Sequence, residues 1–186
     1  EQAGGSLTLY ANSSIDRTIF GLLIPASFFQ AVNPMIIILL GPFIAKLWLK
    51  IDKSNYSIST AKKMGFGLIL LGSGFLLLTF ASNSNTIIIS FWWLIAVYFL
   101  HTLGELCLSP IGLSMVTRVS PKKLASLMMG FWFLSSAVAN YMAGKVPLIL
   151  NSLNINLFGF LTLTSFSSGL LLILIAPFIE KLINKR

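Results

Sequence analysis

Four stretches of this 186-residue chain contain no Asp, Glu, Lys or Arg, and they constrain its fold more than any other feature. They run over residues 18–45, 64–104, 124–144 and 146–179. A helix needs about 20 predominantly apolar residues to cross a bilayer, so each stretch can cross at least once. Hydrophobic residues make up 56% of the chain and charged residues only 10%, against about 45–50% and about 25% in soluble domains. The sequence therefore predicts an all-α, polytopic membrane helix bundle.

Proline and glycine positions divide these stretches into five complete crossings. The predicted helices cover residues 24–49, 60–81, 86–117, 120–145 and 157–182. Ser120 followed by Pro121 has the form of an N-cap and a first-turn proline, so we expect the fourth helix to begin there. The chain opens on Glu1 without an initiator methionine or a signal peptide, and it is expected to be the C-terminal piece of a longer protein.

The charges lie in short clusters between the predicted helices. Thirteen Lys and Arg against five Asp and Glu give a net charge of +8. Most basic residues fall within residues 46–63, 118–123 and 181–186, whereas the opposite ends carry only Arg17 and Lys145. Basic loops stay preferentially in the cytoplasm, so the C-terminus is predicted to be cytoplasmic. Because this rule accounts for the excess charge, no nucleic-acid partner is expected.

Glu105 is an acid near the middle of the third predicted crossing. A charge at this depth costs about 2.5 to 3.5 kcal/mol on insertion scales, so the side chain should face a cavity or a partner. His101 and Ser109 stand four residues before and after it and are expected to point the same way, with Pro110 interrupting the backbone beside them. One interpretation is a substrate or proton site at mid-membrane. The other is a protonated, hydrogen-bonded Glu inside the bundle.

Other polar residues inside the crossings indicate a functional site less strongly. A single His, with Cys107 on another face, does not make a zinc site, so no metal and no cofactor are expected, and Cys107 is interpreted as a small apolar filler. Asn33, before Pro34, either caps a broken hydrogen bond or contacts a ligand. Trp132 either packs in the bundle or lines a wet cavity. The sequence lacks the motifs of an intramembrane protease, and no enzymatic activity is predicted.

Several long motifs resemble the C-terminal half of the proton-dependent oligopeptide transporters, a branch of the major facilitator superfamily. They are GELCLSPIGLSMVTR at 104–118, MMGFWFL at 128–134 and NYMAG at 140–144, and EQAGGSLTLY at 1–10 and FQAVNPMIIIL at 29–39 resemble the family's seventh and eighth helices. The resemblance implies the C-terminal six-helix half of such a carrier. The five crossings would be helices eight to twelve, and residues 1–11 the tail of a truncated helix seven.

The resemblance implies proton-coupled uptake of dipeptides and tripeptides across the cell inner membrane. Glu105 would receive the amino terminus of the peptide, and Asn33 would contact its backbone. Ser109 and Trp132 would line the cavity beside them. Glu1 would match the seventh-helix acid that takes part in proton coupling.

The resemblance also implies a missing partner. The family's first-helix signature, Glu-x-x-Glu-Arg, has no counterpart here, and alternating access needs two halves that move about one site. We therefore expect the chain to be inactive without the N-terminal six-helix half. Two alternatives stay open, namely a related carrier for nitrate or another small solute, and a membrane remnant that transports nothing.

Overall fold

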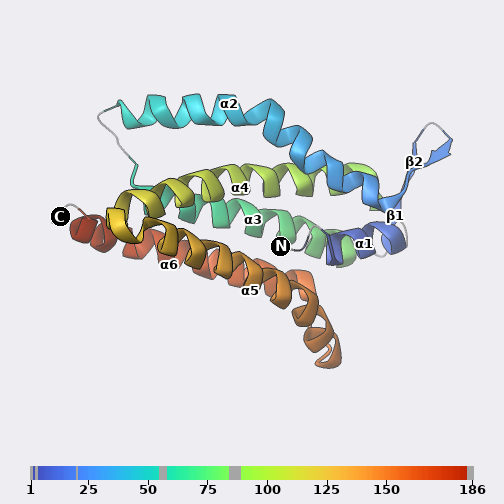
Figure 1. Cartoon of the computed structure of the whole chain (residues 1–186). Helices are drawn as coiled ribbons and strands as arrows, with labels where there is room; N and C mark the ends of the chain where they lie inside the picture. The colour runs from blue at the N-terminus through green and yellow to red at the C-terminus, as the bar shows by residue number, and fades with distance from the viewer. Residues whose placement is uncertain (1, 3, 20, 55–57, 84–88, 184–186) are drawn as a thin grey trace.

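Five long helices make up most of the computed structural model, which describes all residues except 1, 3, 20, 55–57, 84–88 and 184–186. All five are long and apolar enough to cross a membrane. A short helix, α1, precedes them (Figure 1). The helices are α1 (Ser6–Ser14), α2 (Val32–Asp52), α3 (Thr60–Asn83), α4 (Phe91–Val119), α5 (Ala125–Ser152) and α6 (Leu157–Ile183). The predicted all-α membrane bundle is confirmed.

Short elements join the helices at their ends. Two are 3-10 helices, η1 (Ala26–Ala31) and η2 (Lys122–Leu124). Four two-residue strands were not expected from the sequence, namely β1 (Ile15–Asp16), β2 (Thr18–Ile19), β3 (Leu22–Leu23) and β4 (Ile89–Ser90). β1 pairs in parallel with β4, and β2 pairs antiparallel with β3. The first pair ties the end of α1 to the start of α4, because β4 directly precedes that helix.

Helix α3 lies at the centre and packs along both α4 and α6. Glycines make these contacts close. A Cβ atom added to Gly67 would lie 2.7 Å from the carbonyl oxygen of Gly104, and one added to Gly65 would lie 3.0 Å from that of Gly169. In lipid, helices associate through this kind of backbone approach, which small residues permit. The glycine pairs therefore set how α4 and α6 lie against α3.

A buried apolar cluster joins one end of the bundle to α1. Leu7 of α1, Leu78 of α3 and Leu94, Val97 and Tyr98 of α4 are each at most 1% exposed. All five belong to one core cluster, which also includes Phe29 of η1 and Phe158 of α6. Burial of each large side chain contributes about 1.5–3 kcal/mol in water, although lipid would replace part of that driving force. This cluster holds α1 and η1 against the central helices.

Helices α2 and α5 are the outer members and expose most of their apolar side chains. Both bend in Figure 1, and each contains a proline, Pro42 in α2 and Pro147 in α5. Proline removes a backbone donor and clashes with the preceding turn, which explains bends of this kind. The bend directs the Asp52 end of α2 away from α4 (Figure 1). Side chains of both helices line a cavity at that end.

Some helix ends differ from the prediction. Ser120 does not cap α5, because its hydroxyl donates to the carbonyl of Val116 at 2.5 Å and thereby closes α4. The chain then forms η2, and α5 begins only at Ala125. At its other end α5 passes Lys145 and continues to Ser152, since one lysine near an interface does not stop a helix. The predicted start of the third crossing at residue 86 lies outside the described residues.

Candidate functional site

A hydrogen bond joins two residues that lie 72 positions apart in the sequence. The Nδ2 atom of Asn33, in the first turn of α2, donates to Oε2 of Glu105, in the middle of α4, over 3.0 Å. Asn33 is half-buried and Glu105 is exposed. The carboxylate therefore has one oxygen held by the protein and remains open to a ligand. Donors to an ionised carboxylate make stronger bonds than neutral pairs do.

The packing of α4 against α3 explains why Glu105 points away from α3. Gly104 and Cys107, on either side of it, are buried and face α3, where each approaches Gly67. Successive helix residues turn by about 100°, so Glu105 emerges on another face, toward α2. Gly67 and Gly104 thus position the acid without touching it.

Thr102 contacts the Asn33 amide at the end opposite Glu105. Its side chain is fully buried, and its hydroxyl lies 3.3 Å from Oδ1 of Asn33 and 2.7 Å from the carbonyl oxygen of Tyr98. The Asn33 amide is consequently held at both ends, by Glu105 and by Thr102. Thr102 carries no distinctive signal in the sequence, because a threonine in a membrane helix most often donates to its own backbone.

Ser109 continues the same face of α4, and Trp132 of α5 packs against this face farther along. Ser109 is exposed one turn beyond Glu105, and Gly112 follows after three more residues. The Trp132 ring of α5 packs directly on Gly112, where a Cβ atom would overlap it. Seven residues of helix separate Glu105 from Gly112, a rise of about 10 Å. Glu105, Ser109 and Gly112 thus form one stripe along α4, which we call the Glu105 stripe. The acid lies at one end of it and the Trp132 indole packs on the other.

One predicted neighbour, His101, does not join this group. The His101 ring packs against Phe75 of α3, with ring centroids 4.5 Å apart, and covers Gly74. The expectation that His101 points with Glu105 is wrong, because the offset of about 40° over four helix residues turns its ring toward the close α3 contact. Glu1 lies outside the described residues. Among the residues described, no cluster of His, Cys, Asp and Glu could hold a metal ion.

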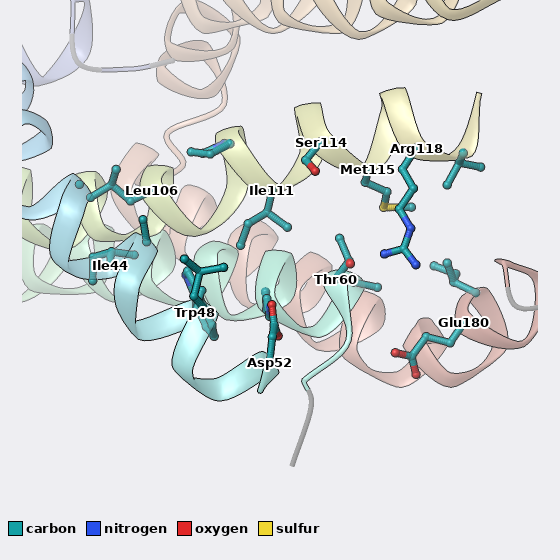
Figure 2. Close-up of a pocket in the computed structure, with 18 residues that line it drawn as sticks. Ile44, Trp48, Asp52, Thr60, Leu106, Ile111, Ser114, Met115, Arg118 and Glu180 are labelled. Atoms are coloured by element: carbon teal, nitrogen blue, oxygen red, sulfur yellow. The ribbon is translucent and has the colours of Figure 1, made fainter. Parts of the chain in front are cut away.

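A charged cavity of about 520 Å³ occupies the space at the Asp52 end of α2, between that helix and α3, α4 and α6. Lys63 is 6% exposed, donates to Oδ1 of Asp52 at 2.5 Å, and lies over the Trp48 ring at 5.1 Å. Arg118 and Glu180 also line it, and both side chains extend into its open end (Figure 2). The sequence carries one signal for the Lys63–Asp52 pair, since Asp52 is an acid within a basic cluster. The positive-inside rule assigns that cluster an orientation and no partner.

A second cavity, of about 660 Å³, lies on the other side of α4, toward α5. Its wall is mostly apolar and includes Trp132, Met115, Met128 and Phe131. Because Trp132 lines it, this cavity meets the Glu105 stripe at Gly112. An apolar, methionine-rich wall can accommodate side chains of different shape.

Comparison with known proteins identifies the family. A family model described as the POT family matches residues 1–160. The chain belongs to the POT family. Among its relatives, the uncharacterized transporter YclF of Bacillus subtilis is 33% identical over 97% of this chain and 37% of that protein. The peptide transporter YePEPT of Yersinia enterocolitica is 36% identical over 78% of this chain and 29% of that protein.

Solved POT structures share the fold. A mutant of a peptide transporter POT in complex with alafosfalin superposes with a TM-score of 0.86 at 31% identity, over 97% of this chain and 37% of that one. The POT chain described here is therefore a multi-pass membrane protein of a transporter family. It spans about a third of the length of the relatives that it matches.

Proposed function

We propose that this chain forms the C-terminal half of a proton-coupled symporter of dipeptides and tripeptides. The observation that carries the proposal is the Asn33–Glu105 pair, an acid held by an amide on an open face in the middle of an apolar bundle. An ionisable side chain at this depth is costly and most often marks a substrate or ion path. Membership of the POT family and the names of its peptide-transporting members support the same conclusion.

Glu105 would receive the peptide amino terminus. A carboxylate pairs with an ammonium group through charge-assisted hydrogen bonds that a neutral side chain does not match. Asn33 lies beside it with an amide suited to a peptide backbone, because an amide both donates and accepts. A carrier of many peptides should hold the parts that all peptides share, and these two side chains offer such contacts.

Ser109 and Trp132 would line the path of the remaining peptide. The rise of about 10 Å from Glu105 to Gly112 compares with the length of about 10 Å of three extended residues. A tripeptide anchored at Glu105 would therefore reach the indole and the apolar cavity beside it. In this proposal Glu1 supplies the proton-coupling acid of the preceding helix, and the Lys- and Arg-rich helix ends and the C-terminus face the cytoplasm of the inner membrane.

The other side of the path would come from an N-terminal half. Glu105 and Ser109 are exposed, as are most apolar side chains of α2 and α5. Two such halves that move about a shared site perform alternating access. The chain alone is accordingly expected to insert in a membrane without transporting.

Uptake of a labelled dipeptide into cells tests the proposal. The chain is joined at Glu1 to the N-terminal part of YePEPT, taken through the first part of its helix seven so that this helix is completed, and the chain alone serves as one control. The chimera should accumulate the dipeptide when the medium is acidic, and Glu105→Gln should abolish most of that uptake. Asn140→Ala is the matched variant, since the Asn140 amide donates to Ser136 of its own helix at 2.9 Å and should leave uptake unchanged.

Competitors separate the alternatives. An unlabelled dipeptide with a free amino group should inhibit uptake, and its N-acetylated form should not. Equal inhibition by the two would refute the role of Glu105 as amine receptor. Inhibition by nitrate but not by peptides would support the small-solute carrier. A chimera that reaches the membrane and moves none of these compounds would favour the remnant.

A further inference from the structure

We infer that Gln30 is a further substrate-binding residue, whose side-chain oxygen accepts a hydrogen bond from the ammonium group of the substrate. The inference rests on the proposed function, because this ammonium group is the one that Glu105 would receive. Gln30 lies in η1, three residues before Asn33 in the first turn of α2.

Gln30 and Asn33 lie on nearly the same face of one continuous helical segment. η1 passes directly into α2, and the backbone N–H of Val32 donates to the carbonyl of Phe29 in a 3-10 turn. In such a turn, side chains three residues apart eclipse one another, and helix neighbours at this spacing have Cβ atoms about 5–6 Å apart. Phe29 is 3% exposed and belongs to the apolar core cluster, whereas Gln30 is exposed. The open face that carries Asn33 therefore also carries Gln30.

The depth of Gln30 indicates what this open face meets. Gln30 falls within the candidate crossing Ala26–Asp52, one turn from Asn33, and Asn33 bonds to the acid in the middle of α4. A polar side chain at such a depth is costly against lipid, because no water is there to replace its hydrogen bonds. We therefore place the Gln30 amide on the face that would line the substrate path.

The Gln30 amide is held by its nitrogen end. Its Nε2 atom donates to Oγ1 of Thr8, in α1, over 2.8 Å. A carboxamide donates through nitrogen and accepts through oxygen, so this bond leaves Oε1 as an acceptor. Within the part of the chain that the structure describes, no group donates to that oxygen. Thr8 thus fixes the amide while its oxygen remains available to a ligand.

A second acceptor beside Glu105 matches the chemistry of an ammonium group, which has three N–H donors. The Asn33 amide does not supply this acceptor, because its Nδ2 atom faces Glu105 and its Oδ1 atom lies 3.3 Å from the Thr102 hydroxyl. The Gln30 oxygen is an available acceptor on the same face. A primary ammonium group would therefore bond to Glu105 through a charged contact and to Gln30 through a neutral one.

Binding of dipeptides to the purified YePEPT chimera tests the inference by isothermal titration calorimetry. One dipeptide is used with a primary, an N-methyl and an N,N-dimethyl ammonium terminus, which keep the positive charge and carry successively fewer N–H groups. Gln30→Leu removes the acceptor and should weaken binding of the primary form about tenfold. It should change binding of the dimethyl form by about twofold at most, because Glu105 takes the single N–H of that form.

Two further variants separate substrate contact from a structural role. Thr8→Val breaks the tie between α1 and η1 but keeps the Gln30 oxygen, so it should weaken binding of the primary form less than Gln30→Leu does. Asn140→Leu is the matched control, because the Asn140 amide donates to its own helix at 2.9 Å, and it should leave all three affinities unchanged. If Gln30→Leu does not insert, Gln30→Met is read by the same criteria.

The outcomes distinguish the inference from the proposed function. Unchanged binding in Gln30→Leu, or equal weakening of the three forms, overturns the inference and leaves the role of Glu105 intact. A wild-type chimera that binds the primary form no better than an N-acetylated form refutes the amine site of the proposed function, and the inference with it.

Discussion

The carbonyl oxygen of Gly67 lies 2.6 Å from the position that a Cβ atom on Gly104 would occupy. The contact is reciprocal, since a Cβ on Gly67 would lie 2.7 Å from the Gly104 oxygen. Real Cβ atoms essentially never approach backbone oxygen this closely. The two helices can lie this near only because both residues lack a side chain, and the acid next to Gly104 takes its direction from this contact.

Gly104→Ala should therefore destabilise the bundle. Overpacking of a tight contact costs about 1–3 kcal/mol, and the small helix-propensity gain of alanine offsets only part of it. We expect a lower melting temperature of the detergent-solubilised chain. Gly130→Ala is the control, because nothing lies within 4 Å of a Cβ there. An equal melting temperature for Gly104→Ala and the wild type would contradict the close packing of α3 and α4.

Asn33→Ala removes the donor that lies 3.0 Å from Glu105. Hydrogen bonds to charged groups contribute about 1.5–3 kcal/mol, so the apparent affinity of the YePEPT chimera for a dipeptide should fall about tenfold or more. The measurement is the concentration dependence of uptake. Asn33→Asp places a second acceptor opposite Glu105 and should be at least as damaging. Wild-type affinity in Asn33→Ala would show that the amide does not serve the site.

Gly112→Ala should disturb Trp132, because the new methyl group would overlap the indole. The expected destabilisation is about 1–3 kcal/mol, as for other overpacked contacts. Adding Trp132→Phe, which shortens the ring, should recover part of the loss. Thermal melting of the two single variants and the double variant measures this coupling. Additive losses would contradict direct packing of the indole on Gly112.

Asp52→Asn should weaken the Lys63 end of the bundle. Removing one partner of a buried pair costs about 3–5 kcal/mol, but Asp52 is 45% exposed and solvent screens the pair, so we expect about 1–2 kcal/mol. Lys63→Met with Asp52→Leu should restore much of the stability, since no uncompensated charge remains. Lys50→Met, at an exposed position of α2, is the control. Chemical denaturation in mixed micelles gives the comparison, and equal stability of Asp52→Asn and Lys50→Met would contradict the buried pair.

The membrane class followed from the sequence alone, because the uncharged stretches leave few other folds open. The five long helices were predicted for the same reason, and the POT motifs predicted the family. Local signals were less reliable at the helix ends. Ser120 illustrates why, since a hydroxyl can cap the following helix or donate back to the preceding one, and only the path of the chain through η2 selects between them.

The sequence by itself determined that an acid, Glu105, stands in the middle of an apolar helix. It also placed Asn33, Ser109 and Trp132 inside helices, but a helical period gives the angle between residues on one helix and not the partner each one meets. Tertiary structure decided that Asn33 reaches Glu105, that His101 turns to Phe75, and that Thr102 stands behind the amide. These contacts depend on how closely α3 and α4 approach, and that distance is set by glycines 37 residues apart in the chain, Gly67 and Gly104.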